Sequence, residues 1–427
     1  MSVPASYNLM WRLARPAIPV ILKRRVAASK EDPARIDERY GRFDHRSDIP
    51  PSPIWIHAVS VGESVGAVAL ARALRARRPD IPLLVTTNTV TAAARIASQP
   101  ADLGLTHLFQ PLDHPDMVDG FLRHVRPRGA LFLESDFWPN LITRTAAANV
   151  PVALVSAQLS DRAFARWTRQ RRLASAVFGA VKLALAVDSE QAHRFGKLGM
   201  NPQNVHVGGS LKLPPAIGTV DEGLVSMLGQ AAGGRRILLA ASTHDGEDGA
   251  IIDAAATLGD SWFTIIAPRH PDRGGAVASQ CAAAGFDAAQ RSTGRAAAPG
   301  DSIYIADTLG EMDSLFSVAD IVFLGGSLQP LGGHNPVEPA AYGLPIITGP
   351  HIYKNRAEFA GLSAAGVVSE IADAGALAAV ARQVTDDSDR MTRIAQAARD
   401  YAARAGQRPE FAADSCLGII EGTGSTA

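Results

Sequence analysis

One stretch decides the fold of this chain: Gly325-Gly-Ser-Leu-Gln-Pro-Leu-Gly-Gly-His-Asn-Pro-Val-Glu-Pro-Ala-Ala-Tyr-Gly-Leu-Pro-Ile-Ile-Thr-Gly349. The apolar run Ile321 to Leu324 precedes it and predicts a buried parallel strand. Two glycine pairs, at 325–326 and 332–333, bring bare backbone to the carboxyl end of that strand. A further apolar strand is expected from Pro345 to Ile347. The stretch is therefore predicted to connect two strands of a parallel α/β sheet.

A short helix is predicted to begin inside this stretch, near Asn335-Pro336, with Pro at its first position. Glu338 lies about one turn into that helix. Backbone amides at a helix start can hold a phosphate, and a carboxylate one turn later can accept hydrogen bonds from ribose hydroxyls. The pattern predicts a nucleotide-sugar site and makes glycosyl transfer the leading hypothesis.

Composition limits the class of protein. The chain has 427 residues, enough for two domains, and it is 47% hydrophobic and 20% charged, which is typical of a globular protein. Lys plus Arg equals Asp plus Glu, at 42 each, so net charge gives no argument for nucleic acid as a partner. Two cysteines predict no disulfide framework and fit a reducing compartment. No run of about 18 apolar residues predicts a membrane span.

The N-terminal leader, residues 1–49, begins with a basic segment that contains no acid before Glu31. Its positive cluster follows the apolar stretch Ala17 to Leu22, which Pro19 interrupts, so a signal peptide is not expected. Two interpretations remain open. The apolar and basic side chains can lie in a membrane interface, or the segment can be a helix packed on the domain. The basic residues are Arg12, Arg15, Lys23, Arg24, Arg25 and Lys30.

Strands alternate with helical patterns along the rest of the chain, which predicts parallel sheets covered on both faces. The rhythm pauses at Gly208 to Pro215, which we interpret as the interdomain connection. The predicted architecture is α/β, with two Rossmann-like doubly wound domains facing across a cleft and ligands at the carboxyl ends of the strands. Residues 50–210 form the first domain, and residues 211–427, with a helical tail, form the second.

Three acids of the first domain and one lysine of the interdomain connection are candidates for carrying chemistry. Glu63 follows the strand ending at His57, at the mouth of a helix, where an ionised carboxylate is favoured and can take a proton. Glu134 and Asp136 end another apolar strand. Lys212 lies in the connection and can balance phosphate or carboxylate charge. The alternatives are an ordinary first-turn Glu63, a surface Glu134, a capping Asp136 and a solvated Lys212.

Polar clusters follow strands of the second domain as well. Ser242-Thr-His244 ends one strand, Pro268-Arg269 the next, and Asp307 to Met312 another. Because the ends of parallel strands share one edge of the sheet, these clusters and the Gly326-Ser327 loop are expected to gather there.

The remaining candidates are weaker. Arg162, Arg166 and Arg169 fall on one helix face, either solvated or binding anionic head groups. Asp387-Ser-Asp389 is interpreted as a solvated turn, and no histidine–cysteine spacing predicts a metal site. No Gly-x-Ser-x-Gly elbow indicates serine hydrolysis.

Taken in order, these motifs resemble those of 3-deoxy-D-manno-oct-2-ulosonic acid (Kdo) transferases, which add Kdo to a lipid A precursor in Gram-negative bacteria. The departures are Glu134-Ser-Asp136 where the family has Glu-Thr-Glu, Ala306 in place of a glycine, and Leu213-Pro214 after Lys212. The matching stretches are Glu38-Arg-Tyr-Gly41, His57 to Glu63, Trp138-Pro-Asn140, Gly209 to Lys212, Ser242 to Glu247, Pro268 to Pro271, Asp307 to Glu311 and Gly325 to Pro350.

The resemblance implies a GT-B fold and inverting, metal-independent transfer from CMP-Kdo, without a cofactor. It places the general base at Glu63 and transition-state stabilisation at Glu134 and Lys212. It implies a bis-phosphorylated, acylated glucosamine disaccharide as acceptor and peripheral attachment to the cytoplasmic face of the inner membrane. The expected donor-binding residues are Ser242, Thr243, His244, Pro268, Arg269, Gly310, Glu311, Met312, Gly326, Ser327, Asn335, Pro336, Val337 and Glu338.

Two other readings of the residues stay open. One is another GT-B protein that uses a UDP- or GDP-sugar, such as a lipid-disaccharide synthase or a sugar-nucleotide epimerase. The other is a catalytically silent protein that binds a sugar nucleotide or a lipid.

Overall fold

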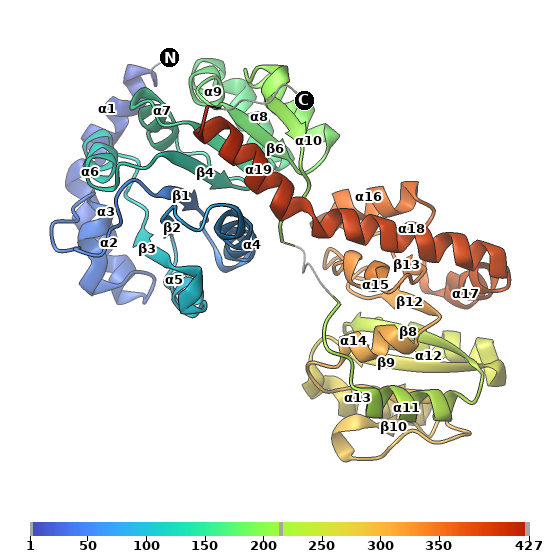
Figure 1. Cartoon of the computed structure of the whole chain (residues 1–427). Coiled ribbons are helices and arrows are strands. Elements are labelled where there is room, and N and C mark those ends of the chain that lie inside the picture. The colour runs from blue at the N-terminus through green and yellow to red at the C-terminus, as the bar shows by residue number, and fades with distance from the viewer. Residues whose placement is uncertain (1–2, 213–216, 423–427) are drawn as a thin grey trace. The chain divides into compact units, whose positions relative to one another are not determined.

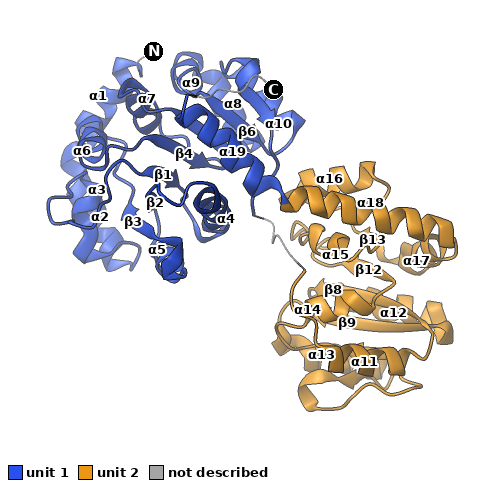
Figure 2. Cartoon of the chain, in the orientation of Figure 1, with its two compact units in different colours: residues 1–212, 407–427 blue, residues 213–406 orange. Residues whose placement is uncertain are grey.

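The computed structural model describes residues 3–212 and 217–422. The chain forms two compact units (Figure 2). The first unit contains the chain up to Lys212 and again from Gln407 onward, and the second unit contains Leu213–Gly406.

A seven-stranded parallel sheet forms the first unit, in the order β3-β2-β1-β4-β5-β6-β7 (Figure 1). Hydrophobic residues cover both faces, as expected for a parallel sheet. Ile54 and Ile56 of β1 enter one core with α4, α5 and α19, and Trp55 enters the other with α6, α7, α9 and α10. The strands are β1 (Ile54–His57), β2 (Leu83–Thr87), β3 (Leu105–Phe109), β4 (Gly129–Leu133), β5 (Val152–Ala157), β6 (Leu183–Ala186) and β7 (Val205–Val207). The helices are α4 (Val61–Arg77), α5 (Val90–Ala97), α6 (Pro115–Val125), α7 (Pro139–Ala147), α8 (Asp161–Arg169), α9 (Arg171–Phe178), α10 (Ser189–Lys197) and α19 (Arg408–Ile420).

The second unit repeats this plan with the strand order β10-β11-β9-β8-β12-β13-β14, again all parallel. Its strands are β8 (Arg236–Thr243), β9 (Trp262–Pro268), β10 (Ala289–Gln290), β11 (Ile303–Ile305), β12 (Ile321–Leu324), β13 (Ile346–Thr348) and β14 (Val368–Glu370). Its helices are α11 (Glu222–Ala232), α12 (Asp248–Leu258), α13 (Gly274–Ala283), α14 (Met312–Val318), α15 (Val337–Ala341), α16 (Arg356–Ala364), α17 (Leu377–Thr385) and α18 (Ser388–Gly406). The predicted α/β class with two doubly wound sheets is confirmed.

Each sheet reverses its strand order at one place, between β1 and β4 in the first unit and between β8 and β12 in the second. Ligands of open α/β sheets bind outside the carboxyl ends of strands at such a switch point. Glu63 follows β1 and Glu134 follows β4, whereas His244 follows β8 and the Gly325–Gly326 loop follows β12. The fold therefore brings the predicted polar segments to the switch point of each unit.

The N-terminal leader packs on the first unit through helices α1 (Ala5–Ala14), α2 (Ile18–Ala27) and α3 (Ile36–Arg39). Val3, Ile18 and Leu22 are buried there, so the leader is part of this unit. This outcome fits the interpretation of a helix packed on the domain. Several apolar side chains of α1 and α2 are nevertheless exposed, namely Leu9, Met10, Leu13, Val20 and Ile21.

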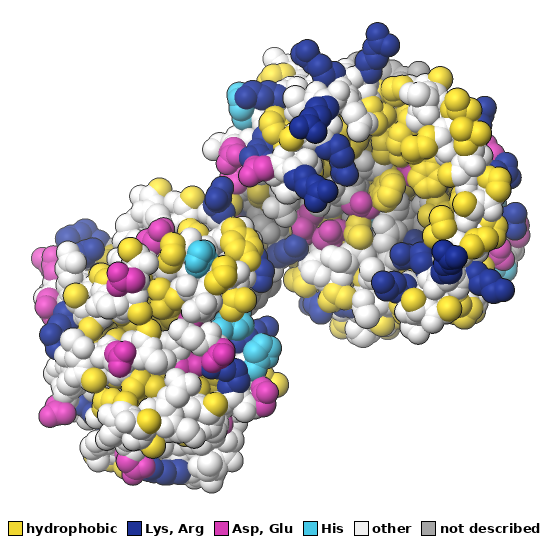
Figure 3. All heavy atoms as spheres, turned by 180° about the vertical axis from the view of Figure 1, so that it is seen from behind, with side chains coloured by type: hydrophobic (Ala, Val, Ile, Leu, Met, Phe, Trp, Pro, Cys, Tyr) yellow, Lys and Arg dark blue, Asp and Glu magenta, His cyan; other side chains and the backbone are white. Residues whose placement is uncertain are grey.

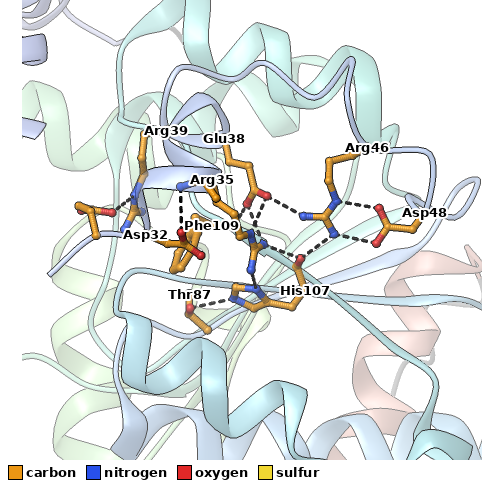
Figure 4. A network of polar contacts seen from close by, with 11 residues as sticks. Asp32, Arg35, Glu38, Arg39, Arg46, Asp48, Thr87, His107 and Phe109 are labelled. Carbon is orange, nitrogen blue, oxygen red and sulfur yellow. Dashed lines mark hydrogen bonds and ion pairs between the residues drawn. The ribbon is translucent and has the colours of Figure 1, made fainter. Parts of the chain in front are cut away.

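A buried polar network ties α3 to the sheet and explains the Glu38-Arg-Tyr-Gly41 motif (Figure 4). The fully buried Glu38 carboxylate accepts hydrogen bonds from Arg35, Arg46 and the backbone N–H of Phe109. Burial, together with the charge of Arg35, lowers the pKa of His107 to about 3, so this ring is neutral. The motif holds the leader in place. The Glu38 carboxylate has a structural role here, because it is buried and hydrogen-bonded to these groups.

The end of the chain departs from the predicted domain division. The sequence assigned the whole helical tail to the second domain, but α19 returns to the first unit. Its face of Ala412, Ala413, Cys416 and Leu417 is buried against the core that contains α4, and Arg77 of α4 forms an ion pair with Asp414. Apolar periodicity shows that a helix has a face to bury, but it does not identify the sheet that receives it. Among the helices of the described residues, none is both long and apolar enough to cross a membrane.

Candidate functional site

Glu63 lies in the first turn of α4, at the carboxyl end of β1. The helix begins after Ser60, whose hydroxyl accepts a hydrogen bond from the Glu63 N–H at 3.4 Å. The Glu63 carboxylate in turn accepts one from the Val59 N–H at 2.7 Å. This reciprocal arrangement resembles a capping box. Glu63 therefore helps to cap α4 and also presents its carboxyl group at the switch point.

Glu63 is only 8% exposed, and burial raises the pKa of its carboxyl group to about 7. The hydrogen bond from Val59 opposes that shift, and the negative charges of Glu134 and Asp136 add to it. The helix start was expected to favour the ionised form, whereas burial is the largest influence on the Glu63 carboxyl group and raises its pKa. A carboxylate with a pKa near neutrality is well matched to taking a proton at physiological pH.

Glu134 ends β4 and forms an ion pair with Lys212. The Lys212 Nζ lies 2.8 Å from Glu134 Oε2, which also accepts a hydrogen bond from Gln158 at 3.2 Å. Glu134 is 5% exposed and has a φ of +60°, a conformation that costs a non-glycine residue free energy and is common at functional sites. The Lys212 ammonium also lies next to Gly62 in the first turn of α4. The structure thus brings Glu63, Glu134 and Lys212 together within the first unit.

Asp136 follows β4 together with Glu134, and the sequence left open whether it serves the site or caps the next helix. The cap of α7 is Trp138, and Asp136 instead accepts hydrogen bonds. Its Oδ2 lies 2.5 Å from the Trp138 indole nitrogen, 3.1 Å from His57 Nε2 and 3.5 Å from Asn88 Nδ2. These three groups come from segments far apart in the chain. The one local signal was the Glu-Ser-Asp spacing at a strand end.

The hydrogen bonds around His57 indicate its tautomer. Thr86 Oγ1 accepts a hydrogen bond from the Trp55 indole at 2.8 Å and lies 2.7 Å from His57 Nδ1. If the hydroxyl donates to Nδ1, the ring carries its proton on Nε2 and donates it to Asp136. This arrangement satisfies every group and keeps Asp136 a hydrogen-bonded carboxylate.

In the second unit, a stacked pair of histidines occupies the switch point between β8 and β12. The Nε2 atoms of His244 and His334 are 2.9 Å apart, and the ring centroids are 5.1 Å apart. Two protonated nitrogens cannot form this contact, so at least one ring is neutral. Burial, helped by the neighbouring His244, lowers the pKa of His334 to about 4. Thr243, by contrast, is fully buried and donates to Asp248 at 2.7 Å.

The amides of the glycine loop are already engaged, which changes the expectation for Gly326 and Ser327. The buried Glu247 carboxylate accepts the backbone N–H groups of Gly326, Ser327 and Leu328 at 2.8–3.0 Å, and that of His244 at 2.9 Å. The Ser327 hydroxyl is buried and donates to the Leu324 carbonyl. These two residues shape the loop in this structure, and their amides are not available to a phosphate.

The segment around α15 is locally hydrogen-bonded and borders a cavity. Asn335 accepts a hydrogen bond from the Val337 N–H at 3.1 Å and donates to Glu338 at 3.2 Å. Pro336 precedes the first helical residue, one position earlier than predicted. Met312, Val337 and Glu338 line a cavity of about 520 Å³ in the second unit. The remaining lining residues include Ile217, Phe316, Tyr342 and Arg399.

The other predicted donor residues lie at neighbouring strand ends. Arg269 is exposed directly after Pro268, the last residue of β9. Gly310 adopts a φ of +86° in the turn before α14. Glu311 forms an ion pair with Arg291 at 2.7 Å. No local pattern in the sequence indicated this pairing, because the two residues are 20 positions apart.

Arg162, Arg166 and Arg169 lie exposed on α8, on one face as their spacing predicted. Their role stays a prediction. In the parts of the chain that the structure describes, no group of three or more His, Cys, Asp or Glu side chains is arranged to hold a metal ion.

Comparisons with known proteins give consistent results. Residues 34–214 match a family model described as 3-Deoxy-D-manno-octulosonic-acid transferase (kdotransferase). The chain is 35% identical to the 3-deoxy-D-manno-octulosonic acid transferase of Bordetella pertussis, over 86% of this chain and 87% of the relative. It is 33% identical to the transferase of the same name from Haemophilus influenzae, over 75% of each chain.

Solved structures show the same fold at low identity. A putative UDP-N-acetylglucosamine 2-epimerase from Listeria monocytogenes has a TM-score of 0.57 at 14% identity, covering 88% of this chain and 98% of that one. The UDP-GlcNAc 2-epimerase from Neisseria meningitidis has a TM-score of 0.55 at 12% identity, covering 86% of this chain and 99% of that one. At these identities the likeness concerns the fold alone.

Proposed function

The chain belongs to the 3-deoxy-D-manno-octulosonic acid transferase family of GT-B glycosyltransferases, and we propose that it transfers Kdo from CMP-Kdo to a lipid A precursor. The acceptor is a bis-phosphorylated, acylated glucosamine disaccharide of the lipid IVA type. The observation that carries the proposal is the buried Glu63 with a pKa of about 7, next to the Glu134–Lys212 pair at the switch point of the first unit.

The reaction is a single displacement that inverts the anomeric centre. An acceptor hydroxyl attacks the anomeric carbon of Kdo, the bond from that carbon to the CMP phosphate oxygen breaks, and the hydroxyl proton passes to Glu63. Lys212, held by Glu134 at 2.8 Å, contributes positive charge near the forming bond. The paired Glu134 keeps that ammonium oriented.

CMP binds the second unit. Arg269 carries positive charge for the departing phosphate, and the proposed reaction requires neither a metal ion nor a cofactor. The cavity lined by Met312, Val337 and Glu338 receives the nucleoside, with Glu338 accepting hydrogen bonds from the ribose.

The acceptor is a lipid, so the enzyme works at the cytoplasmic face of the inner membrane as a peripheral protein. Figure 3 shows hydrophobic side chains gathered along the side of the first unit where α1 and α2 lie, with basic side chains at the margins. The exposed Leu9, Leu13 and Val20 belong to these helices, as do Arg12 and Arg24. Such a surface suits an interface rich in anionic lipid. Arg162, Arg166 and Arg169 are proposed to contact the acceptor phosphates.

Mass spectrometry of the product tests the proposal. Purified enzyme is incubated with CMP-Kdo and a tetra-acylated disaccharide bisphosphate, with EDTA in a parallel sample. We expect the mass of the lipid to rise by one or more Kdo units with and without EDTA. Absence of product, or turnover of a UDP- or GDP-sugar in its place, contradicts the proposal. As a check on the donor, CMP is expected to raise the thermal unfolding temperature more than UDP or GDP does.

A further inference from the structure

A second cavity, of about 460 Å³, lies within the first unit beneath α1 and α2. Its volume falls in the range of about 300–1,000 Å³ that is typical of small-molecule sites. Its walls are mainly apolar, and two indole rings face it. The principal lining side chains are Trp11, Ile18, Ile21, Leu22, Leu112 and Trp138.

This cavity is continuous with the groups that hold the candidate catalytic acids. Val59 lines it and donates its backbone N–H to Glu63 at 2.7 Å. Trp138 and Asn88 line it as well, and both donate to Asp136. A ligand that fills the cavity would therefore contact Val59, the residue whose backbone N–H donates to Glu63.

Two buried polar atoms on the wall, Gln110 Oε1 and the indole nitrogen of Trp11, have no hydrogen-bond partner within the described structure. Gln110 is 3% exposed, lines the cavity, and its Oε1 accepts no hydrogen bond. A buried acceptor without a donor is costly and rare in native proteins. An amide N–H or a hydroxyl at the head of a bound acyl group would satisfy it.

Charged side chains lie at the same wall. Arg25 and Arg39 both pair with the buried Glu31, at 2.8 and 2.9 Å, and all three residues line the cavity. Asp113 also lines the cavity, and burial raises its pKa to about 7, so the charges on this wall nearly balance. Arg25, with 41% of its side chain exposed, is the lining cation that can reach a ligand, and it suits an acyl chain that is attached to a phosphorylated sugar.

We propose that this cavity binds one acyl chain of the acceptor lipid, with the head of that chain toward Val59 and Gln110 and its tail between α1 and α2. This inference rests on the proposed function, because it takes the acceptor from it. Binding the chain there would fix the sugar hydroxyl next to Glu63. An acyl chain held in this way contributes to KM for the acceptor and to positioning, without touching the reacting atoms.

Substitutions at two neighbouring residues of α2 can distinguish acyl-chain binding in the cavity from contact of the outer surface with a membrane. Ile21 and Val20 are similarly exposed, at 53% and 55%, but only Ile21 lines the cavity. Ile21→Asp places a charge at the cavity wall, and Val20→Asp places the same charge on the outer surface. Because both residues are half exposed or more, neither change removes a core side chain.

Transfer is measured in detergent, with acylated and with deacylated disaccharide bisphosphate as acceptors. We expect wild type to favour the acylated acceptor at least about tenfold in KM, since each buried methylene strengthens binding several-fold. Ile21→Asp should remove most of that preference and leave transfer to the deacylated acceptor unchanged, whereas Val20→Asp should keep it. Equal KM values for the two acceptors in wild type, or equal effects of the two variants, would refute acyl-chain binding in the cavity. Neither result would refute the proposed transferase function.

A binding measurement without turnover separates the two proposals further. Trp11 and Trp138 line the cavity, so a dibromostearoyl lipid in detergent should quench part of the intrinsic fluorescence of wild type and of Val20→Asp. Ile21→Asp should lose that quenching. Quenching without any Kdo transfer would support the cavity while refuting the proposed function, and identical quenching in both variants would refute the cavity.

Discussion

Glu63 and Glu247 occupy corresponding places in the two units and have opposite surroundings. Each follows the central strand at the switch point, β1 or β8, and each lies at the start of the next helix, α4 or α12. Glu63 accepts one backbone N–H, from Val59. Glu247 accepts four, from His244, Gly326, Ser327 and Leu328.

The number of donors decides what each carboxylate can do. The Glu247 carboxylate accepts hydrogen bonds from four backbone amides, and these hydrogen bonds fix the conformation of the glycine loop. One donor leaves Glu63 with unsatisfied oxygen positions, next to two further acids, and burial then raises its pKa to about 7. The same topology therefore gives one structural carboxylate and one that can exchange a proton.

The largest effect is expected from Glu63→Gln, which keeps a hydrogen-bond acceptor for Val59 and removes the base. Transfer should fall by about 100- to 10,000-fold. Thermal protection by CMP should stay as in wild type, because CMP binds the second unit. Glu190→Gln, at an exposed first-turn position of α10, is the matched control and should keep full activity. Transfer by Glu63→Gln within tenfold of wild type would remove Glu63 from this role.

Glu247→Gln tests the structural role of the corresponding glutamate in the second unit. An amide has one acceptor oxygen, so some of the four N–H groups lose their partner and stay buried, at about 1–3 kcal/mol each. We expect urea unfolding of the second unit to show a loss of at least about 3 kcal/mol. Glu222→Gln, at the exposed first turn of α11, should change it by less than about 0.5 kcal/mol. A variant as stable as wild type would show that the loop does not depend on Glu247.

Glu63→Gln also has a predicted effect on stability, opposite in sign to its effect on rate. The folded-state pKa of about 7 lies above the ordinary value of 4.5 for a glutamate, so the folded protein binds the proton more tightly. Wild type then loses stability as pH rises from about 4.5 to about 7, and the glutamine variant does not. We expect the variant to unfold at a higher temperature than wild type at pH 8, with the gap closing toward pH 4.5. A gap that widens on acidification would contradict the raised pKa.

The sequence predicted the fold and part of the site for a clear physical reason. Alternating strands and helices determine a parallel sheet, and residues at strand ends must then share an edge, but the strand order that makes β1 and β4 neighbours and brings Glu63 close to Glu134 came from the structure. The contacts of Asp136 with His57 and Asn88, and of Glu247 with the glycine loop, were not predicted, since these partners lie about 50–80 positions away in the chain. The return of α19 to the first unit was missed for the same reason, because local periodicity carries no information on the packing partner.

The smallest effect is expected from Asp136→Asn. The negative charge of Asp136 raises the pKa of Glu63, so its removal should lower that pKa by less than about one unit. The lower limb of the pH–rate profile should move to lower pH, while the maximal rate changes little. If this limb of the profile does not move, the charge of Asp136 does not influence the pKa of Glu63, and the hydrogen bonds of Asp136 with His57 and Trp138 have only a structural role.

The pH dependence of kcat/KM, compared between wild type and Glu63→Gln, tests the central claim most directly. Wild-type activity should rise with pH through an apparent pKa of about 7, as the Glu63 carboxyl group loses its proton. In the glutamine variant, that limb should be absent and the residual rate should not change with pH across this range. A limb near pH 7 that persists in Glu63→Gln would contradict the account, because another group would then be the base.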